Sequence, residues 1–450
     1  MKTASRKTTK KNPENQIQII PTSGEVFSDG SFIELVASPN DGKPALLFWD
    51  GKSVRVAPQI EDLRHSYRPL ELDVSLWQAM RFPSVAKPYG AIEEFFKRTA
   101  NLFEHYIGLS VPEAAMATAW TATTWFPDCL SSPPTLVVSG PDMSHVITFF
   151  RLLACVCRRA LVLGEISRSL VRSLPMALHP TLIVNQPHLS QTVASLLRDS
   201  NYRGLFVPGN GGTVLDLVCS KAIFTGMGNF AQQCNDQAVH LALPPVRSEL
   251  PPLGEREQDR IANLFQPRWL MYRLQHAHKV HQSRSAACAL TFPTLELARN
   301  LMACVPDEPE FAQALVPLLK SQEQDVLVRR SCDLSSAIVE VLWATLHEPT
   351  REATVSRIAD LTNALLRSRG EIREYCAEEV GWRLRDLGIP RHRGRNSMVV
   401  QFSRETSQRV HRLARGFAVQ SLECHAKSCA DCTQLQIVDP NKIVEVSQEL

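Results

Sequence analysis

The stretch that decides the fold of this 450-residue chain is Pro134-Thr-Leu-Val-Val-Ser-Gly-Pro-Asp-Met-Ser-His-Val-Ile147. Its β-branched residues predict a buried strand, Gly140-Pro141 predicts a turn, and the apolar residues that follow predict a helix. Further along, Pro180-Thr-Leu-Ile-Val-Asn-Gln186 predicts a second buried strand, which ends in two amides. Short apolar strands alternate with helical stretches from Thr135 to Leu243, so we expect a mostly parallel sheet covered by helices.

The first stretch has the outline of a phosphate-binding loop without its chemistry. Such a loop reads G-x-x-x-x-G-K-[ST], in which the lysine binds the phosphates and the hydroxyl binds Mg²⁺. Here Gly140 keeps the first position, while His145, Val146 and Ile147 stand in the last three. The second stretch ends in Asn185-Gln186, where an acidic pair would hold Mg²⁺ and activate water. We therefore expect no nucleotide hydrolysis, and we assign no cofactor.

Composition describes an ordinary globular protein, with 44% apolar and 21% charged residues and a net charge of only +3. Nucleic-acid binding would therefore require local clusters of basic residues. Twelve scattered cysteines favour a reducing cytoplasm, and no apolar run is long enough for a membrane span. The predicted parts are a basic disordered tail (1–25), a small β module (26–71), a helical lead-in with the α/β core (72–245), a helical domain (246–350), a winged helix (351–418) and a cysteine-containing tail (419–450).

Three local patterns add detail. Asp50-Gly51 predicts a hairpin between two short strands of the β module. Residues 204–207 are apolar and predict a further strand of the parallel sheet. A helical stripe in the middle domain predicts one buried face, formed by Ile338, Val341, Leu342 and Thr345.

The region from Arg391 to Arg415 contains seven arginines and one glutamate, a net charge of +6 with neutral histidines. It follows two predicted helices and contains a predicted strand, the order that a winged helix needs. Because arginine forms bidentate contacts with phosphate, we predict binding of double-stranded DNA through this domain, with Trp382 and Leu384 in its core. The alternative is a solvated arginine face or a protein-docking surface. The predicted DNA contacts are Arg383, Arg385, Arg391, Arg393, Arg395 and Arg404.

The C-terminal tail carries Cys424-His425, Cys429 and Cys432. Three thiols and one imidazole would suffice for tetrahedral Zn²⁺. Cys424 and His425 are adjacent, however, which makes simultaneous ligation awkward, and no second C-x-x-C lies nearby. We therefore assign no metal site and expect ordinary thiols in a loose tail.

The motif order resembles that of the helicase-like P-loop ATPases, of the AAA+ type, carried by bacterial plasmids, phages and integrative elements. In that family a Lys-Ala-Ile strand and an Asp-Arg pair follow the acidic strand, and the matching residues here are Lys221-Ala222-Ile223 and Asp236-Gln237. The resemblance implies a degenerate P-loop core in which Gln237 replaces the arginine that meets the γ-phosphate. It also implies a bacterial, cytoplasmic protein of a mobile genetic element with a role in DNA replication.

Together these patterns predict a pseudo-ATPase that acts as a DNA-associated scaffold or accessory factor, with a protein partner or as a homo-oligomer, and without membrane contact. Two alternatives stay open. One is an active ATPase or helicase whose catalytic residues are atypical or supplied in trans. The other is a transcriptional regulator whose core senses a ligand.

Overall fold

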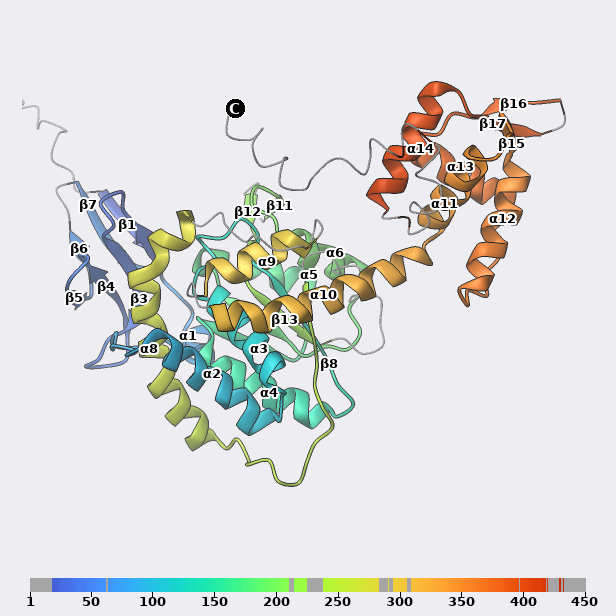
Figure 1. The fold of residues 1–450 in the computed structure, drawn as a ribbon. Helices are drawn as coiled ribbons and strands as arrows, with labels where there is room; N and C mark the ends of the chain where they lie inside the picture. The colour runs from blue at the N-terminus through green and yellow to red at the C-terminus, as the bar shows by residue number, and fades with distance from the viewer. Residues whose placement is uncertain are drawn as a thin grey trace, which may run out of the picture. The chain divides into compact units, whose positions relative to one another are not determined.

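The computed structural model describes residues 18–61, 64–209, 214–224, 238–282, 290, 294–305, 309–395, 397–417, 419, 429 and 432. The chain divides into two compact units, a larger unit, Met1–Gln322, and a smaller unit, Glu323–Leu450. Figure 1 shows a mixed α/β architecture, and its five-stranded parallel sheet confirms that part of the prediction. In the described ranges, no helix is both long and apolar enough to cross a membrane.

The larger unit begins with a β module of two sheets. One sheet has the order β1-β7-β6, and the other is an antiparallel sheet with the order β2-β3-β4-β5. The predicted hairpin at Asp50-Gly51 is confirmed, because Gly51 has a φ of +90° and Asp50 accepts hydrogen bonds from the Lys52 and Ser53 amides. The strands are β1 (Gln18–Thr22), β2 (Gly24–Val26), β3 (Phe32–Ala37), β4 (Pro44–Trp49), β5 (Val54–Ala57), β6 (Ile60–Glu61) and β7 (His65–Pro69).

The predicted disordered tail is too long, because β1 and most of β2 fall within residues 1–25. Strand β1 pairs in parallel with β7, and this pairing satisfies its backbone. Three helices then lead into the core, namely α1 (Val74–Ala79), α2 (Ile92–Ile107) and α3 (Val111–Thr123). Helix α3 starts with a capping box between Ser110 and Glu113, and ten of its residues are buried.

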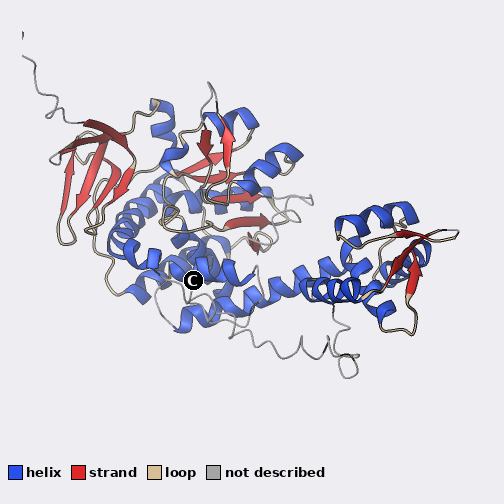
Figure 2. Cartoon of the chain, turned by 90° about the horizontal axis from the view of Figure 1, so that it is seen from above, coloured by secondary structure: helices blue, strands red, loops and turns tan. Residues whose placement is uncertain are grey.

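The parallel sheet has the order β14-β8-β13-β10-β9. Its strands alternate between two cores: Leu136 and Val138 pack with the α4 side, and Val137 packs with the α5 and α6 side. Helices therefore cover both faces of the sheet (Figure 2). The elements are β8 (Thr135–Ser139), α4 (Met143–Val156), β9 (Ala160–Leu163), α5 (Arg168–Ser173), β10 (Thr181–Val184), α6 (Gln191–Asp199), β13 (Lys221–Phe224) and β14 (Ala238–Ala242).

The prediction that residues 204–207 form a strand of this sheet is wrong. The strand there is β11 (Phe206–Pro208), which pairs antiparallel with β12 (Val214–Asp216) in a separate two-stranded sheet. Phe206 is 59% exposed, so this strand lacks the two-sided burial of a central parallel strand. Helices α8 (Glu255–Gln282) and α9 (Thr294–Ala303) follow, and α8 packs along α4. Helix α10 (Pro309–Ser331) contains the boundary between the two units.

In the described part of the smaller unit, helices α11 to α14 pack with a three-stranded sheet of order β15-β17-β16. Helix α11 belongs by sequence to the predicted middle domain, but it packs with α12 and α14. Its predicted buried stripe is confirmed, since Ile338 and Leu342 have no exposed surface. The elements are α11 (Leu334–Leu346), β15 (Glu352–Thr354), α12 (Val355–Ser368), α13 (Ala377–Asp386), β16 (His392–Arg393), β17 (Met398–Gln401) and α14 (Arg404–Gly416).

Candidate functional site

The carboxyl ends of β8 and β13 form the place in this sheet where a ligand is expected. The two strands are neighbours, but the chain leaves β8 towards β9 at one edge and leaves β13 towards β14 at the other. In parallel sheets such a reversal opens a crevice outside the carboxyl ends of the strands. Gly140 follows β8 at this end, and Asn185 follows β10, the strand on the other side of β13.

The loop after β8 is too short to wrap a phosphate group. Only Gly140, Pro141 and Asp142 separate β8 from α4, whereas a phosphate loop has four residues between its glycines. The chain beyond β14 lies against this loop: the Leu243 amide donates to the Ser139 carbonyl at 2.7 Å. A Cβ at Gly140 would stand 3.2 Å from the Leu243 Cβ, so the glycine here allows this close approach.

The Asp142 carboxylate strengthens this closure. Its Oδ2 accepts a hydrogen bond at 3.0 Å from the amide of Val246, beyond β14. Asp142 is also the residue that precedes α4, where an incoming phosphate would need the helix amides. A carboxylate at this place repels an anion, so the start of α4 is poorly suited to phosphate.

The three residues that replace Gly-Lys-Ser/Thr lie within the first turns of α4. His145 and Val146 are buried, and the His145 Nε2 lies 3.0 Å from the Ile107 carbonyl of α2. Ile147 is half-buried. Val146 and the His145 contact with α2 pack α4 onto the helical layer of the core, which accounts for the absence of a phosphate-binding lysine at this place.

The amide pair that replaces the acidic pair is partly used by the loops around it. Gln186 Oε1 accepts from the Ile166 amide at 2.8 Å, and its Nε2 donates to the His188 carbonyl at 3.2 Å. A carboxylate could make only the first of these hydrogen bonds. The Asn185 backbone N–H donates to the Leu163 carbonyl, while its side-chain Oδ1 is buried with no hydrogen-bond partner among the described residues.

The two remaining residues of the resemblance are Gln237, the last predicted nucleotide-site residue, and Lys221 of the Lys-Ala-Ile strand. Gln237 lies outside the described residues. Lys221, from the Lys-Ala-Ile strand, is fully buried at the amino end of β13, away from the crevice. Its ammonium donates to Ser200 and to the Cys219 carbonyl, which shows a structural use of the lysine.

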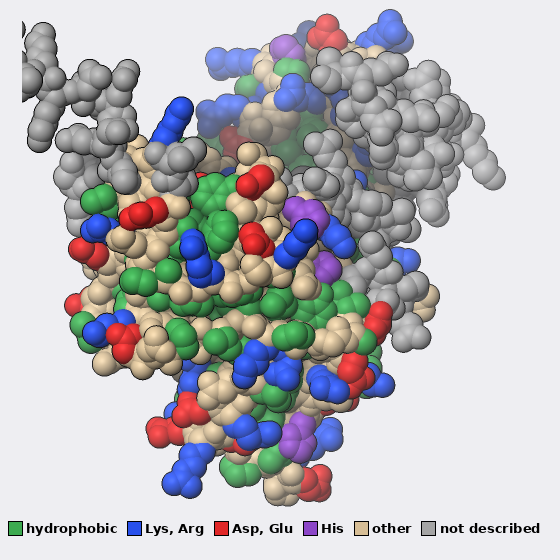
Figure 3. Space-filling model, turned by 90° about the vertical axis from the view of Figure 1, so that its left-hand side faces the viewer, with side chains coloured by type: hydrophobic (Ala, Val, Ile, Leu, Met, Phe, Trp, Pro, Cys, Tyr) green, Lys and Arg blue, Asp and Glu red, His purple; other side chains and the backbone are tan. Residues whose placement is uncertain are grey.

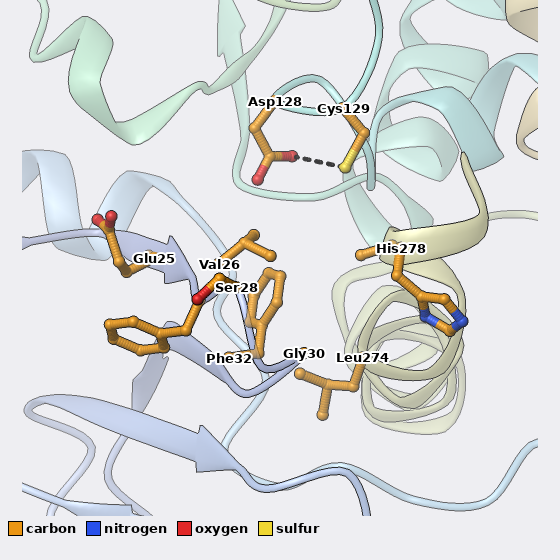
Figure 4. A pocket seen from close by; sticks show the side chains of 12 residues that line it. Glu25, Val26, Ser28, Gly30, Phe32, Asp128, Cys129, Leu274 and His278 are labelled. Atoms are coloured by element: carbon orange, nitrogen blue, oxygen red, sulfur yellow. Dashed lines mark hydrogen bonds between the residues drawn. The ribbon is translucent and has the colours of Figure 1, made fainter. Parts of the chain in front are cut away.

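A cavity of about 530 Å³ lies on the other side of the larger unit, between the β2–β3 turn and α8. Figure 4 shows Asp128 and Cys129 at one end of it and Leu274 and His278 of α8 at another. Acidic and basic side chains are interspersed on the face shown in Figure 3. Asp128 connects the cavity wall to a buried group of charges.

This group, named here the Glu34 cluster, consists of Glu34, Asp128, Arg158, Arg159 and Arg273. Glu34 Oε1 pairs with Arg158 and Arg159 at 2.6 Å each, and its Oε2 pairs with Arg273 at 3.0 Å. Arg273 also binds Asp128 at 2.5 Å and lies over the Phe32 ring. Burial by itself raises the pKa of Glu34, but the three guanidinium groups outweigh it and hold that pKa below its ordinary value. The cluster joins β3 of the β module to the α/β core and α8.

The residues Asp128, Cys129 and His278 do not form a nucleophilic site. Burial raises the pKa of the Cys129 thiol to about 12, so the thiolate is scarce at neutral pH. The Cys129 Sγ faces Asp128 Oδ1 at 3.9 Å, while the exposed His278 ring points away from it (Figure 4). A nucleophilic cysteine needs a base within hydrogen-bond reach, which this arrangement does not provide.

The predicted DNA contacts gather on the smaller unit, on α13, on the hairpin β16–β17 and at the start of α14. All except Arg391 are exposed, and Arg391 is half-buried. Leu384 is buried as predicted, but the prediction that Trp382 is in the core is wrong, because its side chain is 53% exposed. Val380, Gly381 and Leu384 already fill the inner face of this short helix, so Trp382 points outward.

Sequence reasoning missed two groups of residues. An acid within the apolar run Phe32–Val36 was the only signal for the Glu34 cluster, because its arginines lie far away in the sequence. The second group consists of His347, His411, Cys429 and Cys432, whose ligand atoms lie within 4.8 Å of one another. Only the Cys429-x-x-Cys432 spacing indicated it, because His347 directly follows α11 and His411 lies on α14, far from each other in the sequence.

Neither a protein-family model nor a curated protein matches this sequence. Two solved structures of the C-terminal region of NrS-1 show a likeness that covers 82% of this chain and 96% of each of theirs. The first, an apo structure in the A form, is 9% identical with a TM-score of 0.37. The second is 11% identical with a TM-score of 0.34. TM-scores this low do not establish a common fold, so neither structure assigns one to this chain.

Proposed function

We propose that this chain is a DNA-associated protein whose smaller unit is a winged helix that binds the backbone of double-stranded DNA. Its α/β core is a degenerate P-loop fold that acts as a scaffold and does not hydrolyse nucleotide. The observation that carries the proposal is the exposed basic surface formed by α13 and the β16–β17 hairpin.

The segment that leads into the hairpin contacts α13. The Arg391 guanidinium occupies the space that a Cβ at Gly381 of α13 would need. Arg383 and Arg385 of α13 therefore lie on an element that is in contact with the strand carrying Arg393. A helix with an adjacent arginine-bearing hairpin can place side chains in a groove and on the flanking phosphates at once.

The pairing of arginines within the smaller unit supports phosphate as their partner. Several arginines of the smaller unit away from this surface have acidic partners: Arg357 pairs with Glu348, and Arg369 pairs with Glu340 at 2.7 Å. Within the described residues, Arg393 and Arg404 form no ion pair. The Arg383 contact with Asp386, at 3.7 Å between exposed groups, contributes little. Unpaired exposed arginines on one surface are what binding to a polyanion requires.

The core geometry supports the loss of hydrolysis. The short loop after β8, the Asp142 carboxylate before α4 and the use of Gln186 in loop hydrogen bonds each remove a function that phosphoryl transfer needs. Binding energy from α4 amides alone would be opposed by Asp142. The core is left with structural functions, such as holding the helical layer and the β module.

The test is DNA binding by the Arg393→Ala/Arg395→Ala double variant, measured by fluorescence anisotropy on duplexes of several sequences over a range of salt. Affinity should fall alike for all sequences, and the slope of log K against log salt should shrink by about 0.9 for each phosphate that is no longer neutralised, so by about two for the pair. The matched control is Arg367→Ala/Arg373→Ala, which removes the same charge from arginines that pair with Glu374 and Glu379. A folded double variant with wild-type affinity and slope would refute the proposal.

One observation favours a different function, that of a ligand-sensing regulator. The cavity beside the β2–β3 turn, at about 530 Å³, is large enough for a small molecule. A ligand that binds there would raise the melting temperature of the larger unit. A thermal-shift screen of small metabolites, repeated on a variant with Ala277→Phe in the cavity wall, distinguishes this function from a pure scaffold.

A further inference from the structure

We infer that the smaller unit contains a structural Zn²⁺ site with the ligands His347, His411, Cys429 and Cys432. This inference is independent of the proposed DNA binding. His347 follows the last residue of α11, His411 lies on α14, and the two cysteines follow α14 in the sequence. The structure therefore brings donors from three segments to one point, although sequence reasoning assigned no metal here.

The distances between the donor atoms match those around tetrahedral zinc. Cys429 Sγ lies 3.5 Å from His411 Nε2, and Cys432 Sγ lies 3.4 Å from His347 Nε2. For Zn–S of about 2.3 Å and Zn–N of about 2.0–2.1 Å, a tetrahedron requires a sulfur-to-nitrogen separation of about 3.6 Å. All four ligand atoms lie within 4.8 Å of one another, so one ion can reach them all with small adjustments.

The orientation of both histidines is the one that a metal ligand needs. His347 Nδ1 lies 2.7 Å from the Trp343 carbonyl, and His411 Nδ1 lies 2.7 Å from the Ser407 carbonyl. Because a carbonyl can only accept, each Nδ1 carries the proton and each Nε2 keeps its lone pair. Such a hydrogen bond from the second ring nitrogen to a carbonyl is the usual support of a zinc-bound histidine. Each ring is thus fixed by the helix turn that precedes it, with Nε2 towards the thiols.

The chemistry of the donors selects the ion. Two thiolates and two neutral imidazoles offset the charge of a divalent cation, and sulfur and nitrogen donors favour zinc over Mg²⁺ or Ca²⁺. Cys432 and His411 are only 2% and 4% exposed, so the site is closed, as structural zinc sites are. Bound zinc would cross-link α11, α14 and the segment after α14, and so stabilise the helical core against which α13 packs.

Cysteine–histidine hydrogen bonds without metal would explain each distance separately. They would not require two such pairs to meet at one point with both Nε2 atoms facing the sulfurs. The sequence also offers Cys424 and His425 as other ligands, and both lie outside the described residues. The experiment must therefore identify the ligands as well as the metal.

The full-length protein, purified without a metal-affinity step and dialysed, should contain one zinc per chain by elemental mass spectrometry. Its X-ray absorption spectrum should give a first shell of two sulfurs and two nitrogens, and Co²⁺ should replace zinc with thiolate charge-transfer bands. Chelation should lower the melting temperature of the smaller unit, and added Zn²⁺ should restore it. These measurements need no variant, so a misfolded variant cannot hide the answer.

The variants Cys432→Ser, His411→Ala and His347→Ala should each lose more zinc affinity than the roughly 10–100-fold that loss of an outer-shell partner costs. The matched control Cys332→Ser, a half-buried cysteine of the same unit, should keep wild-type affinity. The inference is overturned if the wild-type chain binds no zinc. It is also overturned if the first shell has three or more sulfurs, or if Cys424→Ser or His425→Ala abolishes binding while both histidine variants retain it.

Discussion

Replacing Glu34 by glutamine should strongly destabilise the larger unit. Glu34 is 2% exposed and pairs with three guanidinium groups. Arg273 keeps Asp128 in the variant, but Arg158 and Arg159 lose their carboxylate partner. The glutamine oxygen can still accept from one guanidinium, while its NH₂ group would face another donor.

The expected loss is about 5 kcal/mol, the upper end of the range for a buried ion pair that loses one partner. At about 2 °C per kcal/mol for a unit of this size, the melting temperature should fall by about 10 °C. Calorimetry and urea unfolding both measure it. The matched control is Glu25→Gln on neighbouring β2, an exposed glutamate that should change stability by less than about 0.5 kcal/mol.

The pH dependence gives a second, independent check of the same reasoning. The pKa of Glu34 is held below its ordinary value, so its contribution to stability is present above the unfolded pKa of about 4.3 and is lost as the pH falls through the folded pKa. The difference between wild type and Glu34→Gln should therefore shrink below about pH 4. If Glu34→Gln and Glu25→Gln unfold within about 1 kcal/mol of each other at neutral pH, the cluster does not stabilise the fold as argued.

Three further predictions concern the core and the basic surface. The purified protein should show no Mg²⁺-dependent ATP hydrolysis with or without DNA. Asn185→Asp should not create this activity, because the groups that phosphoryl transfer needs act as a unit and one carboxylate does not replace them. DNA-stimulated phosphate release that is abolished by a substitution in the crevice beyond β8 and β13 would contradict this prediction. Gln186→Glu should lower the free energy of unfolding by about 0.5–1.5 kcal/mol, because glutamate cannot donate the hydrogen bond to the His188 carbonyl. Urea unfolding measures this change, with Gln191→Glu at an exposed position as the control. Arg383→Ala or Arg385→Ala should change the preference among DNA sequences rather than the salt slope, which a competition assay over a library of duplexes would reveal or disprove.

The sequence predicted the parallel sheet well because burial on both faces leaves a strong local signal. Thr135–Val138, Thr181–Val184 and Lys221–Phe224 are short apolar runs, and all three are strands in the structure. The run at 204–207 looked similar, but nothing in a local pattern says which strand is the partner. The prediction for Trp382 was wrong because it rested on the apolar character of the side chain. Helical periodicity places this residue on the outer face of α13, where it stays exposed.

Sites built from distant residues were beyond such local patterns. Glu34 read as an acid in a strand, and its neutralisation depends on arginines 124, 125 and 239 residues away. The zinc ligands show the same limit: Cys429 and Cys432 were visible as a pair, while His347 lies 85 residues before its sulfur contact. The turn at Gly140-Pro141 was predicted from the sequence, but its closure by Leu243 was not.

The Glu34 cluster also limits how early the β module can fold during synthesis. The carboxylate of β3 is synthesised 239 residues before Arg273, which at about 10 residues per second is roughly 24 s. Throughout this interval the nascent β module carries a charge at its core whose last partner does not yet exist. The module that leaves the ribosome first should therefore be among the last parts of the larger unit to become protease-resistant.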